Sequence, residues 1–506
     1  MSAKPAAPPK QKLPHLSYNP VSAIGAAIAL IAALTFGVLL VMSLYSAQPN
    51  PYYGIFMYMA LPPVLVAGLL LIPLGMFLRW RRVRRTGEVV ARWPRLDFND
   101  PRHRNAAIVF VLGTLVFAVI MAVGSYGAYH YSESVTFCGT TCHQVMEPEF
   151  VTYQSSPHAR VACTECHVGP GADWYVKSKL SGAYQIYAAA AETYPRPIPT
   201  PIESLRPAQE TCEQCHWPEK IYGAQQRQRH HFLYDEDNTH WPINLLIKTG
   251  GGDPVSGQTA GIHWHMNIGV DVDYIARDER RQEIPWIRVR DHRTGRITIY
   301  QDADNPLSEA EVATATPRRM DCMDCHNRPS HIFLSPDQAV DEAILQGRID
   351  RRLPAIKAVA VGALAEEYPS KEEALRQIAS RITDHYRLER PQAWESERAA
   401  IDRSIAAVQE VYAGNIFPLM KASWSAYPNN LGHFQSVGCM RCHEGQHLSA
   451  EGVAVTHDCN ACHLILSQGP ESEVLAAAGL DFQHPEDLGG MELEVGCYEC
   501  HTGVQP

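Results

Sequence analysis

Long apolar runs occupy much of the first 130 residues. Three runs without charged side chains lie at about 20–45, 52–78 and 105–130. Each is long enough to cross the hydrocarbon core of a bilayer as a helix. The pattern predicts three N-terminal transmembrane helices, with a tail at 1–17 and a basic loop at 79–104. A re-entrant segment is the alternative for the second run, which contains several prolines.

After residue 130 the hydrophobic patterns are shorter, and they indicate individual helices and strands. The segments "DWYVKSKLSGAYQIYAAAAETY" and "SKEEALRQIASRITDHY" have helical spacing, and "SPDQAVDEAIL" begins with a serine that can cap a helix. By contrast, "IPWIRVRDHRTGRITIYQD" alternates apolar and polar residues around Arg293–Gly295. This alternation predicts a β-hairpin.

Charge changes sign along the chain. Residues 1–104 hold 12 Lys and Arg against 3 Asp and Glu, a balance of +9, whereas residues 131–506 hold 32 against 51, a balance of −19. Because basic loops stay in the cytoplasm, we expect the N-terminus inside and everything after 131 outside the bacterial inner membrane, in the periplasm. Residues 21–44, 52–78 and 106–129 contain no His, Asp, Glu, Lys or Arg. This excludes histidine ligation of a membrane-embedded haem and a proton relay in these runs.

The cysteines carry the clearest chemistry. All 14 fall into seven pairs, and a histidine follows each pair directly. Covalent haem attachment uses C-x-x-C-H, whereas disulfides and zinc sites, the two alternatives, do not need that histidine. The seven motifs are Cys138/Cys142/His143, Cys163/Cys166/His167, Cys212/Cys215/His216, Cys322/Cys325/His326, Cys439/Cys442/His443, Cys459/Cys462/His463 and Cys497/Cys500/His501. We therefore expect seven covalent c-type haems, the first with an extra residue between its cysteines.

Each haem iron needs a second axial ligand besides the motif histidine. Sixteen further histidines are present. The predicted distal ligands are His158, His231, His265, His331, His433, His447 and His484. His230, His263 and His457 are the competing positions.

The block from Phe137 to Tyr222 resembles the NapC/NirT family of membrane-anchored quinol dehydrogenases. The resemblance rests on "FCGTTCH", "MEPEF", "SPHARVACTECH", "KSKL" and "TCEQCHWPEK". Three spans with seven motifs resemble, over nearly the whole chain, the ImcH-type inner-membrane cytochromes of metal-reducing bacteria. The resemblance implies a menaquinol oxidase that hands electrons to periplasmic cytochromes.

The family also implies roles for particular residues. Its first haem lies beside the quinol and is often ligated by a downstream methionine, here Met146, with the motif histidine left off the iron. An ordinary haem with a longer attachment loop and His143 as ligand is the alternative. The quinol site uses a lysine, matched by Lys179, with Lys177 competing. The acidic residue expected six positions later is replaced by Gln185, so Asp173, Glu192 or water would take the protons.

These observations predict a membrane-anchored multihaem cytochrome c, with three transmembrane helices and a mainly α/loop, haem-packed periplasmic domain. We expect a NapC-like four-haem region at 131–335 with a small β insertion at 221–320, a helical linker region at 336–429 and a three-haem region at 430–506. Because haems supply apolar surface, we expect little conventional core. The acidic outer domain predicts basic periplasmic cytochromes as partners, and no nucleic acid.

The expected function is menaquinol oxidation in anaerobic or extracellular respiration. Three alternatives remain from the sequence. They are an electron-wiring subunit without a quinol site, a quinone reductase running in reverse, and a terminal reductase of a small oxyanion.

Overall fold

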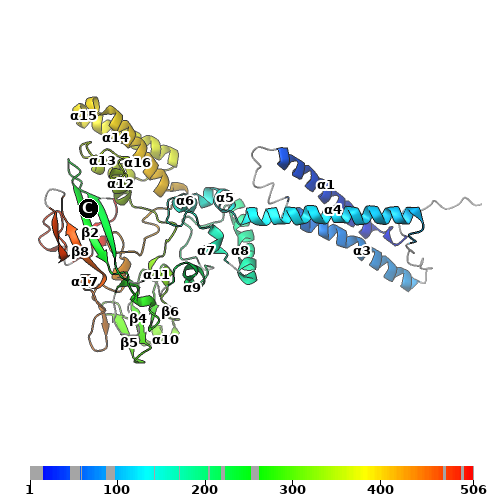
Figure 1. Ribbon diagram of the computed structural model, residues 1–506, viewed down its shortest axis with the longest axis horizontal. Coiled ribbons are helices and arrows are strands. Elements are labelled where there is room, and N and C mark those ends of the chain that lie inside the picture. Colours follow the sequence, from blue (N-terminus) through cyan, green and yellow to red (C-terminus); the bar gives the residue numbers. More distant parts are fainter. Residues whose placement is uncertain are drawn as a thin grey trace, which may run out of the picture. The chain divides into compact units, whose positions relative to one another are not determined.

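The computed structural model describes residues 15–45, 57, 60–86, 97–141, 143–169, 171–202, 205–217, 221, 223–251, 261–470, 474–491 and 495–504. The chain divides into two compact units, Met1–Thr141 and Cys142–Pro506. Figure 1 shows long helices in the first unit and a mixture of short helices, strands and loops in the second.

The described part of the first unit consists of helices. They are η1 (His15–Ser17), α1 (Pro20–Tyr45), α3 (Leu61–Thr86), α4 (Pro101–Ser132) and α5 (Val135–Thr140). Helices α1 and α3 approach closely because small residues line their contact: a side chain on Gly25 would meet the carbonyl oxygen of Gly68 at 2.7 Å. The Ser22 hydroxyl donates across this contact to the carbonyl of Ile72 at 2.8 Å. Small residues and a hydroxyl bond are typical of helix packing in membranes.

Among the described residues, two helices are long and apolar enough to cross a membrane, Pro20–Leu39 within α1 and Leu61–Thr86. Large apolar side chains face outward along the apolar stretches of both helices, as lipid contact requires: Ile31 is 64% exposed and Leu70 is 63% exposed. The third predicted run lies in α4, a helix of 32 residues. The first residues of the second predicted run lie outside the described part of the chain.

The second unit begins with helices that surround the early motifs. They are α6 (His143–Gln154), α7 (Cys163–His167), α8 (Ala172–Ala190), α9 (Ala208–Thr211), η3 (Cys212–Gln214), η5 (Ile262–Met266), α10 (Glu309–Thr314) and α11 (Cys322–Cys325). Helices α12 (Pro336–Leu345), α13 (Ile356–Ala365), α14 (Lys371–Glu389), α15 (Pro391–Ser396) and α16 (Arg398–Asn415) group together (Figure 1). The last helical turns are η6 (Pro418–Met420), η7 (Gly438–Arg441), α17 (Cys459–Cys462) and α18 (Cys497–Cys500).

The described strands form two antiparallel sheets. One sheet has the order β1-β2-β8-β9, from Gln225–Phe232, His240–Ile247, His463–Gln468 and Leu475–Leu480. The other has the order β6-β3-β4-β5-β7, from Arg318–Arg319, Val270–Ile275, Trp286–Asp291, Ile297–Asp302 and His447–Ser449. The hairpin expected around Arg293–Gly295 is present as β4 paired with β5. Each sheet combines strands from 221–320 with strands from 430–506, so these two predicted regions share their sheets.

The expectation of little conventional core is wrong for residues 336–429. Helices α12, α13, α14 and α16 enclose the largest apolar cluster among the described residues, with Val340, Ile356, Ile382 and Val408 fully buried. Ser335 and Ser370 cap α12 and α14, each accepting a bond from the backbone N–H three residues later. This part of the second unit packs as an ordinary helical bundle because apolar residues recur at helical spacing.

Candidate haem centres

Each regular motif forms one helical turn. The amide of His326 donates to the carbonyl of Cys322 at 2.8 Å, and the same bond closes the Cys212 and Cys497 motifs. A turn of this kind places the two cysteines and the histidine on one face, because residues three and four positions apart are neighbours on a helix. The C-x-x-C-H spacing therefore presents two thiols and one imidazole together.

Every regular motif histidine faces a second histidine. Among the described residues there are six such pairs. With the distances between ring centroids, they are His167–His331 (6.4 Å), His158–His216 (6.1 Å), His263–His326 (6.2 Å), His265–His443 (5.9 Å), His433–His463 (6.2 Å) and His484–His501 (6.1 Å).

This spacing matches an iron ion between two imidazoles. Metal–nitrogen bonds of about 2.0–2.1 Å on both sides, plus about 1.1 Å from each nitrogen to its ring centre, separate the centroids by about 6.3 Å. Direct contact gives a shorter separation: the rings of His230 and His240 share a hydrogen bond and lie only 5.1 Å apart. The six pairs fit axial ligation of haem iron.

The hydrogen bonds of the distal rings leave one nitrogen for the metal. The Nδ1 atoms of four rings bond to backbone carbonyls: His158 to Pro329 at 3.2 Å, His331 to Glu149 at 2.9 Å, His263 to Thr249 at 2.6 Å and His265 to Ile262 at 3.0 Å. Such bonds fix the ring and turn the other nitrogen towards a metal.

The protonation state of the rings also suits a metal ligand. Burial lowers the pKa of both His265 and His331 to about 4. Burial likewise lowers the pKa of His167, His326, His433, His463 and His501. Neutral imidazole is the form that coordinates a metal.

Five of the predicted distal histidines lie in these pairs: His158, His265, His331, His433 and His484. The sequence ranking placed His263 only as a competitor, whereas the structure pairs it with His326. His263 and His265 both lie on η5, and they face different motifs. Their spacing of two residues is the signal that could have identified both.

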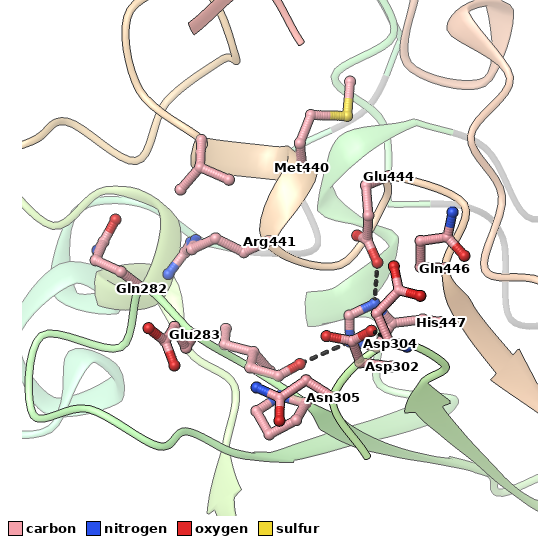
Figure 2. Close-up of a pocket in the computed structure, with 13 residues that line it drawn as sticks. Gln282, Glu283, Asp302, Asp304, Asn305, Met440, Arg441, Glu444, Gln446 and His447 are labelled. Atoms are coloured by element: carbon pink, nitrogen blue, oxygen red, sulfur yellow. Dashed lines mark hydrogen bonds and ion pairs between the residues drawn. The ribbon is translucent and has the colours of Figure 1, made fainter. Parts of the chain in front are cut away.

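His447 is a correction, because both of its ring nitrogens are occupied. Nδ1 lies 2.5 Å from Oε1 of Glu444, and Nε2 donates to the carbonyl of Ile284 at 2.6 Å. Figure 2 shows the bond between His447 and Glu444. The ring lines a pocket of about 240 Å³ whose walls include Glu283 and Asp302 but no paired histidine. His447 therefore has no free nitrogen for iron.

His231 is the second correction. Its Nδ1 lies 3.7 Å from Oδ2 of Asp341, and its ring packs against Phe434 at 5.2 Å. The motif histidine nearest to this contact, His501, is paired with His484. His231 thus belongs to a neighbouring group of buried polar side chains.

Thiols of successive motifs lie close enough to interact. The side chains of Cys212 and Cys322 are hydrogen-bonded to each other. Burial, followed by the nearby thiol of Cys439, raises the pKa of Cys325 to about 11. The other neighbouring thiols are Cys166 with Cys215, Cys439 with Cys462, and Cys459 with Cys497. The second to seventh motifs therefore form one continuous series in space, in chain order.

A buried guanidinium gives a further test of fit. The Nε and Nη1 atoms of Arg206 are buried without a hydrogen-bond partner, and only Nη2 reaches Glu210, at 3.1 Å. The side chain lies against Gly169, just after the second motif. Glu210 supplies the countercharge, but the two buried donors that it does not reach still need acceptors. The oxygen atoms of a haem propionate would be acceptors of that kind.

The first motif is only partly described. Cys142 and the His143 side chain lie outside the described residues, whereas Met146 is half-buried on α6. The division between the two units falls inside this motif.

The predicted quinol residues lie on α8. Lys179 is half-buried, with Nζ 4.8 Å from the centre of the Tyr175 ring. Gln185 is exposed and donates to Ser181 at 3.2 Å, and Asp173 is exposed in the first turn. Residues six apart lie about 120° apart around a helix, so neither shares the face of Lys179. Lys177 places Nζ 4.6 Å from the Trp174 ring.

Comparison with known proteins places the chain in a family. The model of the NapC/NirT cytochrome c family, N-terminal region, matches residues 100–198. The chain is 46% identical to the cytochrome c-type protein ImcH of Geobacter sulfurreducens over 489 residues, 96% of both proteins. It is 29% identical to the cytochrome c nitrite reductase subunit NrfH of Nitratidesulfovibrio vulgaris, over 23% of this chain and 75% of that protein. No solved structure matches. The chain is therefore a covalent-haem electron-transfer protein that belongs to the NapC/NirT cytochrome c family, with an ImcH-type cytochrome as its full-length relative.

Proposed function

We propose that the chain is an inner-membrane menaquinol oxidase that passes electrons through seven c-type haems to basic periplasmic cytochromes. The observation that carries the proposal is the setting of Lys179 on α8, within the segment matched by the family model. Full-length similarity to the cytochrome c-type protein ImcH supports the electron-transfer part of the proposal.

The surface of α8 suits an apolar substrate. Val176, Leu180, Tyr184 and Tyr187 recur at helical spacing and are 54%, 69%, 67% and 64% exposed. A contiguous apolar stripe on an exposed helix is typical of contact with a membrane or a lipid-soluble ligand. Lys179 lies at the edge of this stripe, and the space beside Gly182 is open.

Lys179 can bind and activate the quinol hydroxyl. Its ammonium group donates hydrogen bonds, and a positive charge beside a hydroxyl favours loss of its proton. Menaquinol releases two protons and two electrons on oxidation, and covalent haem supplies one-electron carriers that can divide the pair. Gln185 cannot accept these protons, so exposed Asp173 or water takes them to the outer side.

The histidine geometry supports the haem assignments. The six pairs would supply both axial ligands for the second to seventh haems. In the first motif, Cys142 and His143 follow Cys138 by four and five positions, which turns the histidine about 100° further around a helix than in C-x-x-C-H. This rotation favours Met146 over His143 as an axial ligand of the first haem.

Charge supports the placement of the chain and its partner. The balance of +9 over residues 1–104 favours a cytoplasmic N-terminus, and α4 then serves as a third span. The balance of −19 over residues 131–506 favours a basic acceptor on the periplasmic side.

The proposal is tested by turnover in proteoliposomes. Purified chain is inserted with a menaquinol analogue in the lipid, and a basic cytochrome c is added outside. We expect reduction of the added cytochrome at a rate that depends on both quinol and chain. A chain that dithionite reduces fully, but that transfers no electrons from quinol to cytochrome, would favour an electron-wiring subunit instead.

A further inference from the structure

A group of charged side chains is buried where α12 and α13 meet β1. The ammonium of Lys357, only 2% exposed, lies 2.8 Å from Oδ1 of Asp337 and 2.7 Å from Oδ1 of Asp341. Tyr234 donates to Asp337 at 2.8 Å, and His231 lies beside Asp341. We call Asp337, Asp341, Lys357, Tyr234 and His231 the buried acid cluster.

The cluster holds one negative charge more than it can neutralise. Two carboxylates share one ammonium, and burial lowers the pKa of His231 to about 4, so its ring adds no charge. A buried uncompensated charge is costly, and binding a proton removes the cost.

Asp341 is the carboxyl group of the cluster that can hold this proton. Asp337 is fully bonded, since Gln435 also donates to its Oδ2 at 3.0 Å. Asp341 is different: its side chain is 4% exposed, and its Oδ2 atom has no hydrogen-bond partner. Burial raises the pKa of Asp341 to about 8, although Lys357 opposes the shift. His231, with its side chain 26% exposed, lies 3.7 Å from this oxygen and connects it with solvent.

The cluster lies next to the seventh motif. The Phe434 ring packs between His231, at 5.2 Å, and His501, at 4.6 Å. The two histidine rings are therefore within about 10 Å of each other, a separation over which buried charges are little screened. The amide of Asp337 also donates to the carbonyl of Gly503 at 3.0 Å, which holds the end of the chain against α12.

We propose that Asp341 is a redox-linked proton site. Its carboxylate takes one proton from solvent when one electron reaches the ferric iron held by His484 and His501, and it releases that proton when the electron leaves. The inference rests on the proposed haem at Cys497 and Cys500, but not on quinol oxidation.

Electrostatics gives the size of the coupling. A ferric porphyrin core carries one positive charge, and the added electron removes it. A unit charge on the order of 10 Å away, at an effective dielectric constant of about 20, changes proton affinity about tenfold. The ferric form then holds the pKa of Asp341 roughly one unit below about 8. The potential of the seventh haem should fall by about 59 mV in total across the titration, the equivalent of a tenfold change for one electron, with about half of the fall between pH 7 and pH 8.

The test is a spectroelectrochemical titration of the full haem-loaded chain from pH 6 to pH 9. We expect one haem in the wild type to show this fall, and Asp341→Asn to lose it. Asp384→Asn is the matched control, because it removes an aspartate that is exposed on α14 and paired with Arg387 at 2.7 Å. An equal fall in Asp341→Asn would overturn the proposal.

A second measurement on the wild type avoids any folding defect of the variant. Reduction at pH 7.5 should produce the infrared band of a buried carboxylic acid in a reduced-minus-oxidised spectrum. Absence of that band overturns the proposal, as does a Cys497–Cys500 peptide without haem in mass spectrometry. Reduction by an electrode separates these outcomes from any failure of quinol oxidation.

Discussion

Replacement of His265 with alanine should remove the distal ligand of one haem only. His265 faces His443, with ring centroids 5.9 Å apart and ring planes at 85°. His263, two residues earlier on the same turn, faces His326, and the planes of these two rings differ by only 6°. As haem ligands, the two histidines would therefore serve haems of different ligand geometry.

The angle between imidazole planes gives the prediction its magnitude. The angle sets the splitting of the iron d orbitals, so ferric haems with perpendicular rings give more anisotropic electron paramagnetic resonance spectra than haems with parallel rings. Two of the six pairs are near perpendicular, His265–His443 and His158–His216 at 83°. His265→Ala should remove about half of the strongly anisotropic low-spin signal and add one high-spin haem per chain.

Two variants serve as controls. His263→Ala should reduce the signal of the near-parallel class and leave the anisotropic class intact. His447→Gln should change neither signal, because both nitrogens of His447 bond to protein atoms. Unchanged spectra in His265→Ala, or a new high-spin haem in His447→Gln, would refute the ligand assignment.

Four further predictions concern the quinol site, the helical core, His447 and the acidic outer domain. Lys179→Ala should slow haem reduction by menaquinol at least tenfold (~1.4 kcal/mol in the barrier) while dithionite reduction is unchanged; a slow Lys177→Ala with a normal Lys179→Ala would move the site. Ile382→Ala should lower the unfolding free energy by about 2–5 kcal/mol through a cavity in the helical core, measured by thermal melting; an unchanged melting temperature would contradict this. Burial lowers the pKa of His447, but its bonds to Glu444 and the backbone outweigh this and raise it. Because the folded-state pKa is raised, this contribution to stability is present below about pH 6.5 and is lost at higher pH. The unfolding free energy of the wild type should therefore depend on pH differently from that of His447→Gln, and identical pH dependence would count against this prediction. Electron transfer to a basic cytochrome should slow as ionic strength rises from ~10 to ~300 mM, and a flat rate would exclude electrostatic steering.

The motifs could be identified from the sequence because haem attachment is a local requirement. Two thiols and an imidazole must share one helical turn, so the spacing itself carries the chemistry. The distal ligands depend on folding, which brings His331 to His167 across more than 160 residues. His158 and His433 were predicted because they lie close to motifs, and the structure places their rings opposite His216 and His463.

Closeness to a motif in the sequence wrongly indicated a haem ligand where other hydrogen bonds occupy the ring nitrogens. His447 lies four residues after a motif histidine, yet Glu444 and the carbonyl of Ile284 occupy its nitrogens. No pattern in the sequence indicates that β7 pairs with β5 and so brings His447 to the carbonyl of Ile284, just before β4. His263 was predicted only as a competitor because doubled histidines were expected to include one that faces water, whereas the structure places its ring opposite His326.

The helical region at 336–429 shows the same limit for packing. Its spacing predicted helices, and α12 is capped by Ser335, the serine that the sequence indicated. Ser370 caps α14 in the same way, although the sequence analysis did not single it out. The expectation that haems would replace the core came from the average motif density. Because no motif lies in this segment, its helices instead bury Val340 and Ile382 against one another.

Stopped-flow mixing is the direct test of whether this chain itself oxidises menaquinol. The oxidised chain in detergent is mixed anaerobically with a menaquinol analogue, without any other protein, and the haem absorbance is followed. The spectrum of reduced c-type haem should appear after mixing with quinol alone, and it should rise more slowly in Lys179→Ala. An oxidised spectrum that persists with quinol, but changes fully with dithionite, would contradict menaquinol oxidation by this chain.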